Sequence, residues 1–103
     1  MVDIDTLPPV FEREYGCTTA EWARWMAEFV TGGRAVEDRP EGAIDVALGD
    51  GRLTVRWRAL PPRAIALIRL PRLSVHFAFD RVSSADRSAF MRHLDLRLQR
   101  GGG

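Results

Sequence analysis

The chain has no lysine and no asparagine, and it has one cysteine and one glutamine among 103 residues. All 15 of its basic residues are therefore arginines. Because lysine and asparagine codons are rich in adenine, this composition indicates a GC-rich bacterial genome. A single cysteine, Cys17, excludes an internal disulfide and fits a reducing cytoplasm.

Long apolar runs are also missing. No run approaches the roughly 20 residues that span a bilayer, and residues 1–5 have neither the basic residues nor the apolar core of a secretory signal. Hydrophobic residues make up 46 % of the chain and charged residues 28 %, which is typical of a globular protein and excludes disorder as the main state. We expect one cytoplasmic domain of ordinary size.

The residues that carry most enzyme chemistry are scarce. The two histidines and the cysteine are isolated from one another, so no zinc spacing is present, and there is no glycine-rich phosphate loop or nucleophile elbow. Ser74, His76 and Asp80 share one strand face, but neighbours on a face lie about 7 Å apart, too far for a catalytic relay. Cys17 precedes a predicted helix, where the dipole could lower its pKa, although a small residue beside the cap is the more ordinary interpretation. We therefore expect no enzyme activity, no metal and no cofactor.

Acidic residues are missing from the whole stretch between Asp50 and Asp80. Residues 1–50 hold 11 acids and 4 arginines, a balance of −7, whereas residues 51–103 hold 3 acids and 11 arginines, a balance of +8. This asymmetry indicates either an anionic partner or two oppositely charged surfaces that meet within the protein or across a dimer.

The first half of the chain begins with a segment that has no clear period. Residues 1–17 contain Pro8-Pro9 and are predicted to form an extended N-terminal arm, anchored by Val10, Phe11 and Tyr15. Thr18 and Glu21 then form a capping box, which predicts the start of a helix. The apolar stripe that follows has helical spacing and ends before Gly32-Gly33; its members are Trp22, Trp25, Met26, Phe29 and Val30.

The period changes to two after residue 42, which predicts strands. Residues 43–48 and 52–59 alternate around a short turn at 49–51. Pro61-Pro62 is expected to end the second strand, because proline cannot donate to a ladder. The apolar run 64–70 is then expected to form an inner strand, and Pro71-Arg72 a tight turn before a last strand at 73–80.

The last element is a second helix, which opens at Ser83 and is expected to reach about Leu98. Residues 94–99 alternate like a strand as well, so a strand remains the alternative there. The fold class is α+β: a two-layer sandwich with a four-stranded antiparallel meander and two helices on one face, in the order α-β-β-β-β-α. The domain covers 18–100, followed by a flexible glycine tail at 101–103.

The predicted core lies between the helices and one sheet face. Its members are Trp22, Trp25, Met26, Phe29, Ile44, Val46, Leu48, Leu53, Val55, Trp57, Val75, Phe77, Phe79, Phe90 and Leu94. If Pro71-Arg72 is a two-residue turn, the even-numbered residues of 64–70 also face this core. The other sheet face has no cover in this arrangement, and function is expected there.

Two hypotheses follow for the uncovered face. The preferred one is a non-enzymatic protein-interaction or homodimerisation domain, with an interface at Ile65, Leu67, Arg69 and His76. The alternative is an anion-binding module for nucleic acid or a phosphorylated ligand, with Arg52, Arg56 and Arg58 as the binding residues and Arg69 nearby. Nucleic acid is the less favoured partner, because no aromatic residue is predicted on that face for base stacking.

Overall fold

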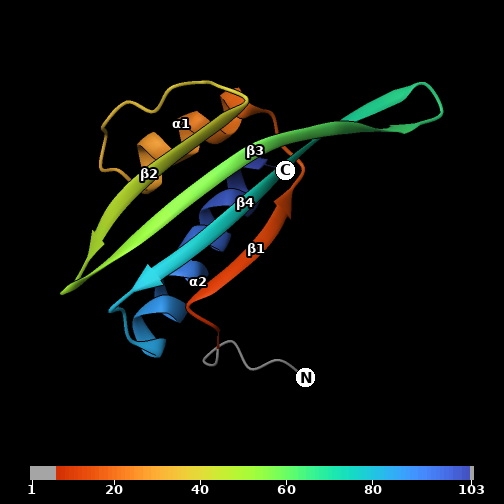
Figure 1. The fold of residues 1–103 in the computed structure, drawn as a ribbon. Coiled ribbons are helices and arrows are strands. Elements are labelled where there is room, and N and C mark those ends of the chain that lie inside the picture. Colours follow the sequence, from red (N-terminus) through yellow and green to blue (C-terminus); the bar gives the residue numbers. More distant parts are fainter. Residues whose placement is uncertain (1–6, 103) are drawn as a thin grey trace.

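A computed structural model of the protein describes residues 7–102, with side chains for residues 7–98. The chain forms four strands and two helices in the order β-α-β-β-β-α, as Figure 1 shows. The elements are β1 (Val10–Tyr15), α1 (Thr19–Phe29), β2 (Glu41–Leu48), β3 (Gly51–Ile65), β4 (Ile68–Asp80) and α2 (Ser84–Gly102). Residues 1–6 of the predicted arm and Gly103 of the predicted tail lie outside the described residues.

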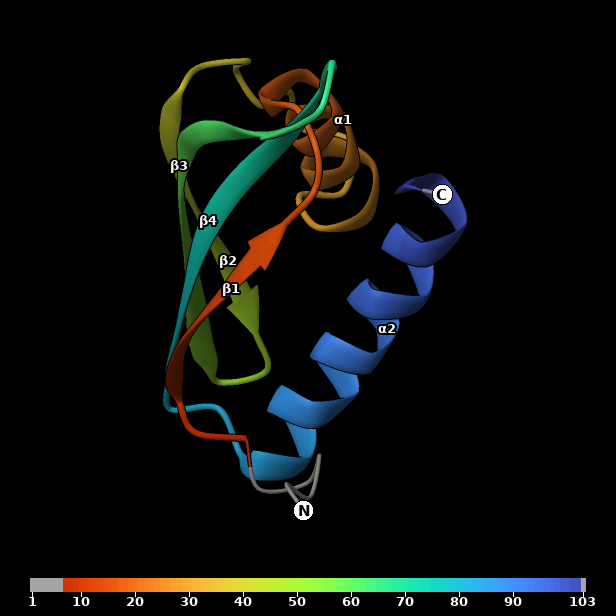
Figure 2. The same ribbon diagram turned by 90° about the vertical axis from the view of Figure 1, so that its right-hand side faces the viewer.

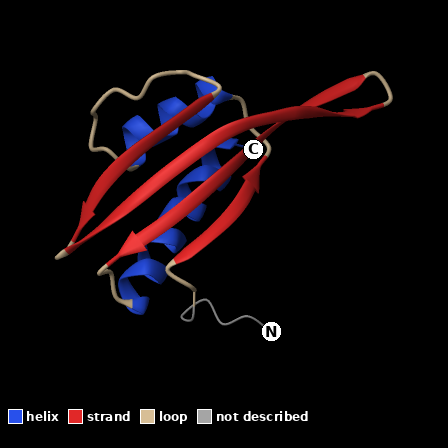
Figure 3. Cartoon of the chain, viewed as in Figure 1, coloured by secondary structure: helices blue, strands red, loops and turns tan. Residues whose placement is uncertain are grey.

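The architecture is a two-layer α+β fold. The four strands form one antiparallel sheet in the order β1-β4-β3-β2. Both helices lie on the same side of this sheet, as the side view in Figure 2 shows, and Figure 3 shows the opposite side without a helix. The predicted class, the strand number and the placement of the helices are therefore confirmed, whereas the predicted element order needs two corrections.

The first correction concerns the run at residues 64–70, which we predicted as a separate inner strand. Instead, β3 continues through Pro61-Pro62 to Ile65, the chain turns at Ala66 and Leu67, and β4 begins at Ile68. The two prolines coincide with an irregularity in the ladder between Leu60 and Arg63. Prolines are tolerated at bulges and on edge strands, and β3 has become an edge strand at this point because β2 begins only at Glu41, opposite Arg58.

The second correction concerns the N-terminal segment, which we predicted as an extended arm and which instead supplies the fourth strand of the sheet. Residues Val10–Tyr15 form β1, which pairs with β4 from Val10↔Ala78 to Tyr15↔Leu73. Phe11 is half-buried and its ring stacks on Phe77 with centroids 5.2 Å apart. Tyr15 is half-buried as well, whereas Val10 is exposed. Two of the three predicted anchors therefore pack onto the fold.

Helix α1 forms as its capping box predicts. The Thr18 hydroxyl accepts a hydrogen bond from the Glu21 amide at 3.1 Å, and a Glu21 carboxylate oxygen accepts one from the Thr18 amide at 3.0 Å. The stripe then buries Trp22, whose ring meets that of Trp57 on β3 edge to face at 6.2 Å. This contact fixes α1 over the sheet.

The core lies where the sequence places it. Ten of the predicted core residues are buried: Trp22, Trp25, Met26, Leu53, Val55, Trp57, Val75, Phe77, Phe79 and Leu94. Five more pack against this cluster while partly exposed: Phe29, Ile44, Val46, Leu48 and Phe90. Three of these five belong to β2, which is an edge strand and therefore keeps one side in water. Residues 64–70 are all exposed, so the part of the core that we predicted there is wrong.

Helix α2 resolves the open choice at residues 94–99. The Ser83 hydroxyl accepts from the Asp86 amide at 3.1 Å, and the helix extends to Gly102, so it includes two of the residues assigned to the predicted tail. Leu94 and Leu98 are both buried, as helical spacing requires. An ion pair of 2.7 Å between Asp95 and Arg13 ties this helix to β1.

Candidate functional site

The most distinctive feature of the molecule is the end of the β3-β4 hairpin, which leaves the two-layer body (Figure 1). The neighbouring strands stop first, because the last residue of β1 pairs with Leu73 and the first residue of β2 pairs with Arg58. Beyond these points, within residues 7–102, β3 and β4 pair only with each other. Residues 61–70 are exposed without exception. We call this segment the projecting hairpin.

The projecting hairpin has one apolar side. Residues that pair across an antiparallel ladder project to the same side, so the pairs Ile65↔Ile68 and Arg63↔Leu70 share one side. The three aliphatic residues of this set are exposed to 52 %, 60 % and 44 % for Ile65, Ile68 and Leu70. Leu67 in the turn is fully exposed. Four large aliphatic side chains therefore face solvent within six residues of sequence.

The root of the hairpin is fixed by one arginine. Arg72 on β4 donates to both carboxylate oxygens of Glu14 on β1, at 2.8 and 3.2 Å. It also donates to the carbonyl oxygen of Pro61 on β3 at 3.3 Å. The hydrogen bonds from Arg72 hold the pKa of Glu14 below its ordinary value. Three strands are joined at the point where the hairpin leaves the body.

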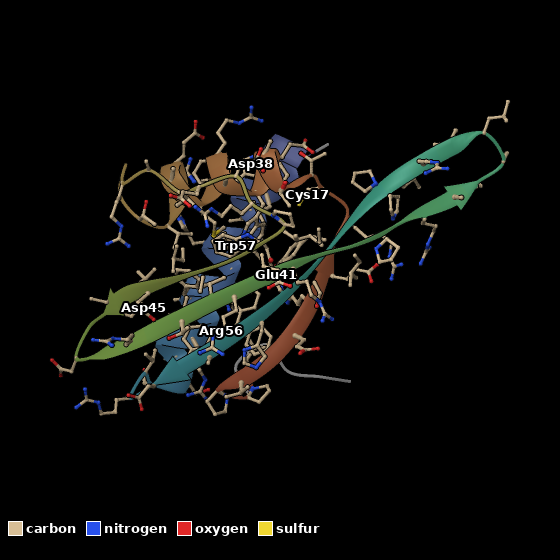
Figure 4. All side chains as sticks on the ribbon, turned by 45° about the horizontal axis from the view of Figure 1, so that its top comes forward. Cys17, Asp38, Glu41, Asp45, Arg56 and Trp57 are labelled. Carbon is tan, nitrogen blue, oxygen red and sulfur yellow. The ribbon has the colours of Figure 1, made fainter. Side chains whose placement is uncertain are left out.

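The second surface is the sheet face opposite α1 and α2, which neither of these helices covers (Figure 2). We call it the open face. Two rows of paired residues cross its centre: Ala43, Arg56, His76 and Glu12, and then Glu41, Arg58, Ser74 and Glu14. A shallow hollow of about 610 Å³ lies over these rows, and Figure 4 shows Arg56 and Glu41 on this part of the sheet. Acids on the two edge strands therefore flank arginines on the inner strand β3.

The arginines of the open face fall into two groups. Arg56 and Arg58 line the hollow, whereas Arg52 lies at the other end of β3, opposite Asp80 and Ala47. Within residues 7–98, neither Arg56 nor Arg58 lies within 4.0 Å of a carboxylate as an ion pair. Two other ion pairs join residues 1–50 to residues 51–103. In one, Glu14 of the acidic half pairs with Arg72 of the basic half. In the other, Arg13 of the acidic half pairs with Asp95 of the basic half.

The predicted interface residues are only partly brought together. Ile65, Leu67 and Arg69 all lie on the projecting hairpin, but His76 stays on the open face beside Arg56. Arg69 pairs with Ala64, so it projects to the side opposite the aliphatic residues. The expected apolar centre of the open face is therefore wrong, because the true turn at Ala66 and Leu67 carries these residues past the end of the sheet.

Two residues that contribute to the apolar side, Ile68 and Leu70, were assigned to the core from the sequence. A signal for their true position exists in the sequence. Pro61-Pro62 and Pro71 stand on either side of the turn, and Leu60 pairs with Arg72 next to them. Prolines at matching places on two neighbouring strands indicate that both strands have lost their outer neighbours.

Groups with catalytic potential are not assembled in the part of the chain that the structure describes. Ser74 and His76 both line the hollow, but they remain two residues apart on one strand. Burial first, and the nearby charge of Glu21 second, raise the pKa of the Cys17 thiol to about 11, so it is not a thiolate at neutral pH. Among residues 7–98, no group of three histidine, cysteine or acidic side chains is placed to hold a metal ion.

Neither helix, over its described residues, is long and apolar enough to cross a bilayer. Comparisons of the chain with protein families, with curated proteins and with solved structures found no match. What the protein does therefore has to be inferred from its own two surfaces, the projecting hairpin and the open face.

Proposed function

We propose that this protein is a non-enzymatic self-association domain whose binding element is the projecting hairpin. The observation that carries the proposal is the exposure of Ile65, Leu67, Ile68 and Leu70 on a hairpin that no other described element covers. A two-stranded hairpin on its own is marginally stable in water, and contiguous exposed apolar side chains mark interaction sites. Contact with a partner removes these side chains from water and stabilises the hairpin.

The test is sedimentation velocity over a range of concentrations. The wild-type chain is expected to form a dimer at micromolar concentration, and Leu67→Asp is expected to be a folded monomer. Leu96→Asp is the matched control, since Leu96 is a leucine 54 % exposed on α2; this variant should still dimerise. A wild-type chain that stays monomeric at high micromolar concentration contradicts the proposal.

A second function, anion binding on the open face, is favoured by a separate observation. Arg56 and Arg58 lie side by side on the rim of the hollow, and neither forms an ion pair with a described carboxylate. Arginine forks bind phosphate or carboxylate groups with two hydrogen bonds. Glu12 and Glu41 lie on the same rim and oppose a highly charged ligand such as a nucleic acid, which makes this the weaker candidate.

A further inference from the structure

We infer that the tip of the projecting hairpin seats in a cavity at the root of the same hairpin in a second copy of the chain, so that two copies exchange tips about a two-fold axis. This inference rests on the proposed self-association and names the surface that receives the hairpin. Its occupant is the Ala66-Leu67 turn of the partner, which carries the most exposed aliphatic side chain on the hairpin.

The receiving cavity lies between β2 and the loop that precedes it. It measures about 320 Å³, which is about ten times the roughly 30 Å³ that one water occupies in the liquid. Its apolar lining includes Val36 from the loop, Ile44 from β2 and Trp57 from β3. Gly42 lies directly against the indole of Trp57, because a Cβ at this position would overlap that ring. The cavity is therefore large enough to admit an aliphatic side chain, and Val36, Ile44 and Trp57 offer it apolar contacts.

The position of the cavity makes the exchange reciprocal. Gly42 and Trp57 pair with each other next to the root of the hairpin, and the ten positions from Trp57 to Leu67 span about 33 Å at roughly 3.3 Å per residue. The hairpin points away from the body, so its own tip does not reach this cavity (Figure 1). Two hairpins laid antiparallel side by side place each tip at the root of the other. In a two-fold contact both exchanges then form together.

The charges around the tip and around the cavity are complementary. Arg63 and Arg69 stand close to the tip, and neither forms an ion pair within the described residues. Three charged residues line the cavity, Glu37, Arg39 and Glu41. Arg39 already forms an ion pair with Glu37, so Glu41 is the acid that faces an incoming arginine. Because the hairpin has no acid of its own, insertion of the tip brings the arginines of one copy to Glu41 of the other. This gives the −7 and +8 halves of the sequence a place to meet across a dimer.

Two features of the hairpin favour a contact made by side chains over backbone strand pairing, and a protein partner over a bilayer. Pro61, Pro62 and Pro71 lack the amide hydrogens that a ladder needs, so the hairpin root is poorly suited to pair with a further strand. The segment 58–76 has no aromatic residue. An arginine-bearing apolar tip could also enter an anionic bilayer, but tryptophan and tyrosine, which anchor proteins at the bilayer surface, are missing from it.

The inference is tested by disulfide formation between two single-site variants. Leu67→Cys and Val36→Cys are purified separately, mixed in equal amounts and oxidised at mildly alkaline pH. Cys17 stays in place, because it is only 3 % exposed in the core. The expected result is a covalent dimer between the two variants, identified by its mass, that forms in the mixture and not with Leu67→Cys alone. Ala89→Cys, at an exposed position of α2, replaces Val36→Cys as the control and should give no such product.

The possible results distinguish self-association through the hairpin from the exchange of tips between two copies. If Leu67→Cys alone becomes a covalent dimer, the tips meet each other, and the exchange is wrong although self-association stands. If no product forms while Leu67→Asp still abolishes the dimer in sedimentation, the hairpin docks elsewhere and the exchange is again wrong. A monomeric wild-type chain that co-sediments with phosphatidylglycerol vesicles overturns both the exchange and the proposed function.

Discussion

Arg72 and Glu14 form a two-pronged ion pair between neighbouring strands, with Nη2 to Oε1 at 2.8 Å and Nε to Oε2 at 3.2 Å. The pair lies at the last rungs of the β1-β4 ladder, where the hairpin leaves the sheet. The same guanidinium reaches the carbonyl of Pro61. A guanidinium suits this position because it is planar and has several N–H donors. From β4, Arg72 can therefore hydrogen-bond both β1 and β3 at once.

The first prediction concerns the titration of Glu14. Its pKa lies below the ordinary 4.5 because Arg72 hydrogen-bonds the ionised form, so the ion pair stabilises the fold above that pH and the contribution is lost as the pH falls through the lower, folded-state pKa. Arg72→Gln should raise the midpoint of Glu14, followed by carboxyl carbon NMR. Arg81→Gln, whose arginine lies near Asp80 instead, should leave it unchanged. Equal midpoints in wild type and Arg72→Gln would show that the ion pair does not persist in solution.

The second prediction concerns Trp57, which is buried against Trp22 beneath α1. Trp57→Ala leaves a large cavity in the core and should lower the free energy of unfolding by about 3–5 kcal/mol. Arg56→Ala, one position along the same strand and exposed, should change it by about 0.5 kcal/mol or less. Urea unfolding of the two variants measures both. A loss below about 1 kcal/mol for Trp57→Ala is incompatible with a packed indole at this position.

The third prediction concerns Gly42, where a side chain has no room. A Cβ at this position would lie 2.6 Å from Cε2 of Trp57, so Gly42→Ala should cost about 1–3 kcal/mol through overpacking. Gly16→Ala is the control, because its Cβ would make an ordinary contact of 3.9 Å with the Pro71 carbonyl.

The cause of the Gly42 effect can be isolated with a double variant. Trp57→Phe removes the part of the indole that meets the new Cβ, so Gly42→Ala should cost less in the Trp57→Phe background than in wild type. Strict additivity of the two changes in urea unfolding would mean that the indole is not what Gly42 accommodates.

The helices and the two strands around Gly49 were predictable because their signals are local. The capping box at Thr18, the helical stripe and the alternation of β2 and the first part of β3 each depend on residues within one element. The hairpin was not predictable in the same way. Whether Pro61 ends a strand or lies on a free edge depends on where β1 and β2 stop, and this is a property of the assembled sheet.

The same distinction applies to the two surfaces. Alternation alone places Arg56 and Arg58 on the side away from the helices, and the structure has them exposed there. The apolar run at 64–70 reads equally as a buried strand, since periodicity does not tell a short apolar strand in a core from one that projects. The cavity beside β2 is lined by Val36, Ile44 and Trp57, which come from three separate segments. No local pattern in the sequence predicts that these residues lie together.

The last prediction tests anion binding on the open face. If Arg56 and Arg58 bind phosphates, labelled single-stranded DNA should bind with an affinity that falls with salt, at a log–log slope of about −1 to −2 for two contacts. Arg56→Gln with Arg58→Gln should abolish this binding. Arg52→Gln should preserve most of it, since Arg52 lies away from the hollow. If both variants bind DNA as the wild type does, the open face is not the anion site. If the wild type does not bind at all at physiological salt, Glu12 and Glu41 neutralise these arginines within the fold.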